Sequence, residues 1–167
     1  PIDFSQVLSG TIGTVTDMDV FSFIANANDT ITLRFAETAN TTGYFEPYLE
    51  IYDAAGAKVT SAESSYPDYG KIEKKLTLSG TYYILVRDDG LNGAGTYSLA
   101  LQRVNNPGNT TTINFGQTLS GPIDSFAQMV AYSFSASAND KVFITFTELT
   151  QASGSFEPLL ELYDATG

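Results

Sequence analysis

The chain contains no cysteine, no histidine and no tryptophan. Without cysteine it can form no disulfide, no thiol nucleophile and no cysteine-based metal site. Without histidine as well, Ser-His-Asp and Cys-His arrangements and the common zinc sites are excluded. Tryptophan is the aromatic side chain favoured as a platform for sugars, so its absence weakens the case for a sugar-binding site. These absences predict that the chain is not an enzyme.

Positive charge is also scarce. Eight lysines and arginines stand against 19 aspartates and glutamates, so the net charge is −11. A surface this acidic repels the phosphates of nucleic acids and anionic lipid headgroups. Long apolar runs are missing too, since a stretch such as Tyr82–Val86 is far too short to span a bilayer. The sequence therefore predicts no nucleic-acid partner and no membrane insertion.

What the chain does contain is an internal repeat. Residues 2–56 align with residues 113–167 without a gap, at a constant offset of 111 (113 − 2), and about 26 of the 55 aligned positions are identical. The segment FEPYLEIYDAAG at 45–56 returns as FEPLLELYDATG at 156–167. Repetition at a fixed period identifies the folding unit.

The first copy has the pattern of many short strands. Apolar residues alternate with polar ones at period two, as in Ile31, Leu33 and Phe35, and turns rich in glycine, aspartate and asparagine separate the runs. This pattern is typical of an all-β protein, and here it predicts a jelly-roll-like antiparallel β-sandwich. The predicted strands cover residues 4–9, 19–25, 30–36, 47–53, 57–60, 71–78, 81–87 and 95–103.

The repeat divides the chain into three parts. Residues 1–104 are predicted to form one complete β-sandwich module, residues 105–112 (NNPGNTTT) a polar linker, and residues 113–167 the N-terminal half of a second, homologous module. Half a sandwich exposes its inner face and leaves its strand edges unpaired. The strands equivalent to 57–104 would then come from a continuation of the chain, or from another chain by β-augmentation.

Four motifs follow one another in the first module: FSFIANAND, FEPYLEIYDAAG, SGTYYILVRDDG and GAGTYSLALQRV. In this order they resemble the bacterial pre-peptidase C-terminal domain family, and residues 113–167 match the first half of the same pattern. The resemblance implies a non-catalytic, jelly-roll-like β-sandwich that is attached to exported or surface proteins. It also implies roles in secretion, in spacing, or in binding matrix or polysaccharide, and it suggests calcium as a cofactor, because related collagen-binding modules bind that ion.

These observations predict a non-catalytic tandem structural or adhesive module of a secreted or cell-surface bacterial protein. Its expected partners are other β-sandwich modules or copies of itself, and extracellular matrix or polysaccharide. One alternative is a self-assembling extracellular filament or sheath subunit, in which strands of a neighbouring chain complete the second module. A further alternative is a calcium- or polysaccharide-binding accessory module of an exported hydrolase.

Calcium is the most specific ligand that the sequence suggests. The turn RDDGLNGAG brings Asp88, Asp89 and Asn92 together among glycines and supplies several oxygen ligands within one loop. Asp17 and Asp19, in the loop before the second strand, form a second candidate site. The alternative for both is ordinary turn chemistry, because aspartate and asparagine often hydrogen-bond their own backbone.

Two further groups of side chains are candidates for a function. Tyr66 and Tyr69, in the loop SSYPDYG, could contact a ligand or a partner, although anchoring of the loop is the more ordinary role. Glu46 and Glu50 lie four positions apart in one predicted strand, so their side chains share a face at about 13 Å, with a rise of about 3.3 Å per residue. Glycosidases need their two carboxyl groups within roughly 5–9 Å of each other. Glu46 and Glu50 are too far apart for this, so a structural role is predicted for both.

Overall fold

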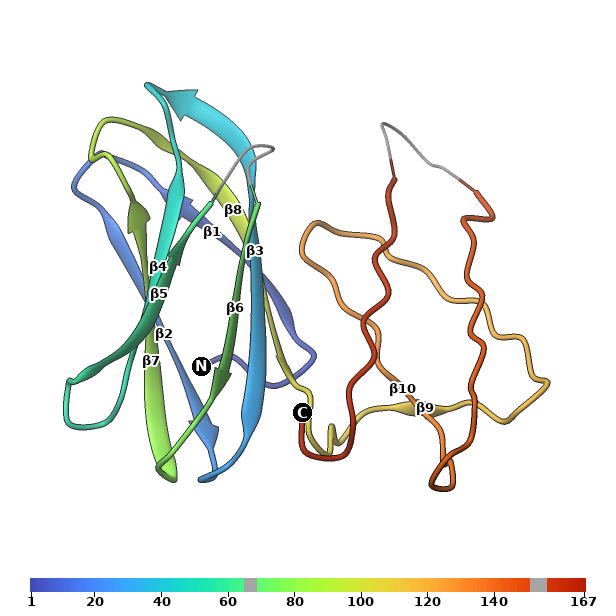
Figure 1. The fold of residues 1–167 in the computed structure, drawn as a ribbon. Coiled ribbons are helices and arrows are strands. Elements are labelled where there is room, and N and C mark those ends of the chain that lie inside the picture. The colour runs from blue at the N-terminus through green and yellow to red at the C-terminus, as the bar shows by residue number, and fades with distance from the viewer. Residues whose placement is uncertain (65–68, 151–155) are drawn as a thin grey trace.

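The structure is a computed structural model, and it describes residues 1–64, 69–150 and 156–167. Residues 7–103 form eight strands in two four-stranded sheets (Figure 1). The strands are β1 (Val7–Ile12), β2 (Met18–Ala25), β3 (Thr30–Thr42), β4 (Pro47–Tyr52), β5 (Lys58–Glu63), β6 (Tyr69–Lys75), β7 (Gly80–Asp88) and β8 (Ala94–Arg103).

The strand order is that of a jelly roll. One sheet has the order β1-β8-β3-β6 and the other β2-β7-β4-β5, and every pairing in them is antiparallel. Eight strands in two such sheets are the jelly-roll arrangement of two interlocked Greek keys. The predicted all-β sandwich is therefore confirmed.

Most strand boundaries differ from the prediction by one to three residues, and the end of β3 differs by six. The differences at β1 and β3 have a clear cause. β1 begins at Val7 because the chain turns before it: the Asp3 amide donates to the Gln6 side chain at 2.9 Å, and Ser5 has a φ of 72°. β3 runs on to Thr42, well beyond the predicted end, because two register shifts against β8 let the ladder continue where the alternation breaks.

The core lies between the two sheets. Inward side chains from both are fully buried, such as Leu33 and Leu99 in one sheet and Leu49 and Ile84 in the other, each with 0 % exposure. These are the alternate apolar residues that the sequence pattern placed on one face of each strand. Burial of this face is the main source of stability for such a sandwich.

The pairing of strands follows a simple rule. Strands β1–β4 belong to the N-terminal half of the module, residues 2–56, and β5–β8 belong to its C-terminal half, residues 57–104. Every ladder joins one strand of the first group to one of the second: β1 with β8, β2 with β7, β3 with β6 and β8, and β4 with β5 and β7. The N-terminal half therefore forms no ladder within itself.

Residues 113–167 illustrate this rule. In the part of them that the structure describes, the strand β10 (Tyr132–Ser133) is the one element assigned, and it pairs in parallel with β9 (Thr111–Thr112). The described residues of the segments equivalent to β2, β3 and β4 form no further ladder, although the same sequence pattern forms long strands in the first module. The difference arises because each of these strands pairs, in the first module, with a strand from residues 57–104.

The described residues contain no helix that is long and apolar enough to cross a membrane.

Candidate functional site

The two outer faces of the sandwich differ. On the β2-β7-β4-β5 sheet, four large apolar side chains point into solvent: Met18 is 55 % exposed, Val20 61 %, Ile24 76 % and Tyr83 41 %. Each alternates along its strand with a residue that faces the core. We call the outer side of this sheet, marked by these four residues, the exposed face.

The register of the strands places these side chains in rows across the exposed face. Ser22 pairs with Tyr83, which pairs in turn with Tyr52, and this gives a row that contains two tyrosines. In another row the Arg87 guanidinium lies over the Tyr48 ring at 4.4 Å from its centroid. Tyrosine, arginine and methionine are enriched at the cores of protein interfaces. The face thus has the composition of a binding surface.

The outer side of the β1-β8-β3-β6 sheet is covered by the chain's own residues 105–150 and 156–167 (Figure 1). Ser98 Oγ on β8 donates to the Phe126 carbonyl at 2.7 Å, and Gln102 Nε2 donates to Asn109 Oδ1 at 3.3 Å. Ser98 is 3 % exposed and Gln102 4 %, although both point away from the core. We call this side of the sandwich the covered face.

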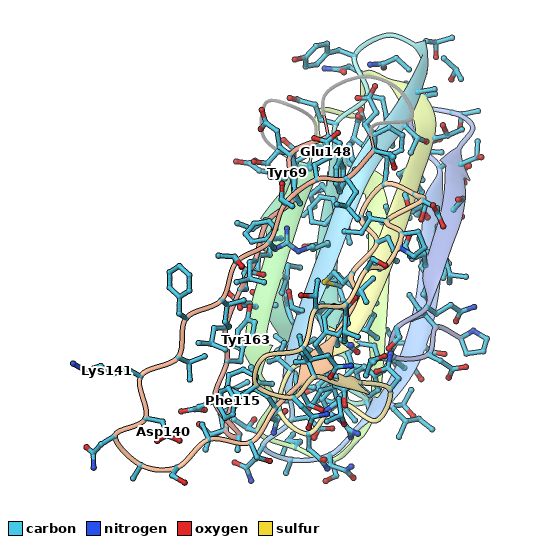
Figure 2. The ribbon with its side chains drawn as sticks, turned by 90° about the vertical axis from the view of Figure 1, so that its right-hand side faces the viewer. Tyr69, Phe115, Asp140, Lys141, Glu148 and Tyr163 are labelled. Carbon is cyan, nitrogen blue, oxygen red and sulfur yellow. The ribbon has the colours of Figure 1, made fainter. Side chains whose placement is uncertain are left out.

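A cluster of charges joins the segment 156–167 to the covered face. Arg34 Nη2 donates to Glu161 Oε2 at 2.7 Å, and Lys71 Nζ donates to the same carboxylate. The Tyr163 hydroxyl donates to Glu73, which also pairs with Lys71 at 3.0 Å. Figure 2 looks onto this segment and shows Tyr163 in front of the strands.

The charges in this cluster shift one another's pKa values. Burial raises the pKa of the Glu161 carboxyl, but hydrogen bonds from Lys71 and Arg34 lower it, and the net shift is downward. The hydrogen bond from Tyr163 lowers the pKa of Glu73 despite partial burial. Burial, followed by the hydrogen bond to Glu73, raises the pKa of Tyr163 to about 12.

We therefore expect contact between segment 156–167 and the covered face to depend on pH. The lowered carboxyl pKa values mean that Glu161 and Glu73 stabilise the contact above their ordinary pKa of 4.5, and that this contribution is lost as the pH falls below it. Tyr163 contributes below its ordinary pKa of 10.0, and its contribution is lost as the pH rises towards about 12. Backbone amide chemical shifts of Arg34 and Lys71, followed by NMR from pH 7 to pH 3, measure the loss of this contact in acid.

Glu161→Gln should weaken the contact at pH 7 as low pH does, because it removes the negative charge that Arg34 and Lys71 share. The matched control is Glu157→Gln, which makes the same charge change on an exposed residue of the same segment. The control should leave the shifts of Arg34 and Lys71 where they are. Equal changes in both variants would show that net charge, and not this cluster, holds the segment.

The turn predicted to bind calcium is organised by Asp88. The Asp88 side chain is fully buried, and its carboxylate accepts three backbone N–H groups: Glu46 at 2.9 Å, Asn92 at 2.7 Å and Gly93 at 3.0 Å. Oδ1 faces the backbone of Glu46, Oδ2 faces the backbone of the turn, and neither oxygen faces solvent. Asp88 is thus a structural acceptor that links the β7–β8 turn to the chain before β4.

The structure does bring Asp88, Asp89 and Asn92 into one turn, but with different roles. Asp89 and Asn92 are exposed, whereas Asp88 can bind an ion only if three N–H groups lose their acceptor. Within the described ranges, no group of three histidine, cysteine, aspartate or glutamate side chains could hold a metal ion. Calcium binding stays a prediction that must rest on Asp89 and Asn92.

The carboxylates of the second predicted calcium site, Asp17 and Asp19, also accept hydrogen bonds from other residues of the protein. Asp17 Oδ2 accepts the Gly13 amide at 3.0 Å, and its Oδ1 accepts the Met18 amide at 2.9 Å, so Asp17 closes the β1–β2 turn. Asp19 accepts the Tyr97 hydroxyl at 2.6 Å. Tyr97 is fully buried on β8, so this bond ties the two sheets together, and burial with the Asp19 hydrogen bond raises the pKa of the Tyr97 hydroxyl strongly.

Of the two tyrosines predicted to contact a ligand, the structure describes one. Tyr66 lies outside the described residues. Tyr69 begins β6 and is 52 % exposed, and strand alternation places it on the same side as Lys71 and Glu73, which is the covered face. A ligand role for either tyrosine stays a prediction.

Sequence reasoning missed the exposed face. Its signal was present in β2, where Met18, Val20 and Ile24 alternate with the inward Phe21 and Phe23, so that both faces of the strand are apolar. A strand with one face in water normally carries polar residues there. An apolar outer face on such a strand is therefore the sequence signal of a candidate binding surface.

No protein-family model matches the chain, and no curated protein matches it. Among solved structures, the chain is similar to the pre-peptidase C-terminal domain of a collagenase from Bacillus anthracis, with 17 % identity, 60 % of this chain and 91 % of that chain covered, and a TM-score of 0.47. It is also similar to PliG of Aeromonas hydrophila, a periplasmic inhibitor of g-type lysozyme, with 16 % identity, 58 % and 85 % coverage and a TM-score of 0.41. The first of these two structures is a domain of the family that the sequence motifs resemble.

Proposed function

We propose that this chain is a non-catalytic adhesive module of a secreted or cell-surface bacterial protein, and that it binds its partner through the exposed face. The observation that carries the proposal is the set of four exposed apolar side chains on one sheet, Met18, Val20, Ile24 and Tyr83. The opposite face is occupied by the chain itself. The exposed face is therefore the surface available to a partner.

The chemistry of the exposed face favours a protein partner over a polysaccharide. Val20 and Ile24 are aliphatic, so they offer a sugar neither a hydrogen bond nor a flat ring. A protein can bury them, and the Arg87–Tyr48 pair, which lies in the same row as Met18, is of the type that dominates binding energy at interfaces. A net charge of −11 keeps such a module soluble outside the cell.

The proposal predicts that the full chain binds an insoluble matrix protein, for which fibrous collagen is the probe, and that it does not bind cellulose or chitin. Ile24→Ser together with Tyr83→Ala should weaken binding at least about tenfold, because one buried apolar contact is worth about 1.4 kcal/mol or more. Co-sedimentation at increasing chain concentration measures the change.

Leu78→Ser is the matched control, because Leu78 is 58 % exposed but lies in the β6–β7 turn and not on the exposed face. It should bind like the unmodified chain. Binding to cellulose or chitin that the same double variant weakens would favour the accessory-module alternative. Concentration-dependent polymers in electron microscopy would favour the filament alternative.

A further inference from the structure

Residues 113–167 keep the local structure of the first module's N-terminal half. The Ile2 amide donates to the Ser22 carbonyl at 2.9 Å, and at the offset of 111 the Ile113 amide donates to Ser133 at 2.9 Å. The rings of Phe4 and Phe23 meet edge to face at 6.2 Å, and those equivalent to them, Phe115 and Phe134, at 6.1 Å. The second copy thus repeats these local contacts of the first.

The turns between the strands repeat as well. Asn28 and Asn139 have φ values of 72° and 70°, and Gly56 and Gly167 have 79° and 88°. The side chains of Asp29 and Asp140 accept the amide three residues before them at 2.8 Å and 2.7 Å. Figure 2 shows the turn at Asp140 and Lys141 extending away from the sandwich. The turns at Asn139 and Gly167 therefore already have the conformation of their equivalents in the first module.

What differs between the copies is the burial of the core positions. Six apolar residues that are at most 1 % exposed in the first module have equivalents that are 37–64 % exposed in the second. The pairs are Ile12 and Ile123, Ile31 and Val142, Leu33 and Ile144, Phe35 and Phe146, Leu49 and Leu160, and Ile51 and Leu162. An apolar surface of this kind, with unpaired strands beside it, is unfavourable in water.

From this contrast we infer that residues 113–167 are a preformed acceptor for a polypeptide with the strand pattern of β5–β8, the C-terminal half of a homologous module. The first module shows how such a half binds. Leu33 lies between Ile72 on β6 and Leu101 on β8, so Ile144 is expected between the residues equivalent to these two. The inference is independent of adhesion through the exposed face.

A second copy of residues 1–167 does not fit the acceptor. These residues contain two N-terminal halves, 2–56 and 113–167, but one C-terminal half, 57–104, which already completes the first module. A copy that gave up its 57–104 strands would expose the apolar face of its own first half. Exchange of the 57–104 strands between copies therefore buries no additional apolar surface. The occupant is a C-terminal half other than the one that completes the first module.

The covered face leaves the acceptor available for this partner. Glu161 and Tyr163, which contact Arg34, Lys71 and Glu73, are equivalent to Glu50 and Tyr52 on the outer side of β4. The alternate residues Leu160 and Leu162 are equivalent to the inward Leu49 and Ile51 and stay exposed. The segment thus binds the first module through its outer side, and its inner side is free.

The test adds an isotope-labelled polypeptide of residues 57–104 to the full chain and follows amide hydrogen exchange. Exchange at 141–146 and 158–163 should slow by at least about 100-fold, because these backbones enter ladders. The equivalent strands β3 and β4 are the internal reference, since they are paired with or without the probe. A probe with Ile84→Asp should not protect the segment, whereas one with Tyr83→Asp should, because Ile84 faces the core and Tyr83 faces solvent.

A second form of the test covers a probe that is insoluble alone: residues 57–104 are fused directly after Gly167, where the first module continues from Gly56 to Ala57. The same protection is expected, with an unfolding transition for the second module. Unchanged exchange in the fused chain would overturn the inference. Protection that develops in the unmodified chain on self-association would also overturn it, because a second copy would then be the occupant.

Discussion

Replacing Asp88 with alanine is expected to destabilise the first module by about 4 kcal/mol, because each buried or partly buried N–H group left without an acceptor costs about 1–3 kcal/mol. Three such groups, on Glu46, Asn92 and Gly93, lose their acceptor at once. For a domain of about 100 residues this lowers the Tm by at least roughly 15 °C. Thermal unfolding followed by far-ultraviolet circular dichroism measures the loss.

The size of this effect depends on burial and not on charge. Asp89→Ala removes the neighbouring carboxylate, but Asp89 is exposed, so the change should stay within about 0.5 kcal/mol. Asp88→Asn keeps one acceptor oxygen, which can serve Asn92 and Gly93, while its amide group would face the Glu46 N–H. Its cost should therefore fall between the other two. Equal effects at 88 and 89 would contradict a structural role for Asp88.

Asp88 also shows why a ligand site is difficult to predict from such a turn. A cluster of aspartates and asparagines among glycines supplies oxygen atoms in both roles, as metal ligands and as acceptors for backbone N–H groups. The two roles differ only in whether the carboxylate faces solvent or the turn. That direction is decided by the contact between the β7–β8 turn and Glu46, which lies 42 residues before Asp88.

The fold itself followed from short-range pattern. Alternation of apolar residues identified all eight strands, because each has one face in the core, and turn residues separated them. The sheet order did not follow, since every ladder of the first module joins segments on opposite sides of Gly56. Alternation says which face of a strand is buried, but not which neighbour covers its edge.

The internal repeat predicted more of the structure than the alternation within single strands did. It predicted that residues 113–167 are half a module, and the same offset relates the turns, the Phe115–Phe134 contact and the exposed core positions to their partners in the first copy. The covered face could not be foreseen in this way. Arg34 has Thr145 as its equivalent, so the ion cluster with Glu161 is not a repeated feature.

The repeat also predicts that the same substitution has different effects at equivalent positions of the two copies. Leu49→Ala should destabilise the first module by about 3 kcal/mol, since removing a fully buried leucine side chain costs about 2–5 kcal/mol. Leu160→Ala changes the equivalent residue, which is 45 % exposed, and should shift the same transition by less than about 0.5 kcal/mol. Urea unfolding of both variants, followed by tyrosine fluorescence, measures the difference.

The same pair of substitutions becomes equivalent once the acceptor is filled. In the chain with residues 57–104 fused after Gly167, Leu160→Ala should destabilise the second module by about 3 kcal/mol, as Leu49→Ala does the first. Leu159→Ala is the control, because Leu159 is equivalent to Tyr48 on the outer side of β4 and should cost little in either chain. A Leu160→Ala effect as large in the unmodified chain as in the fused one would mean that residues 113–167 already bury this leucine by other contacts.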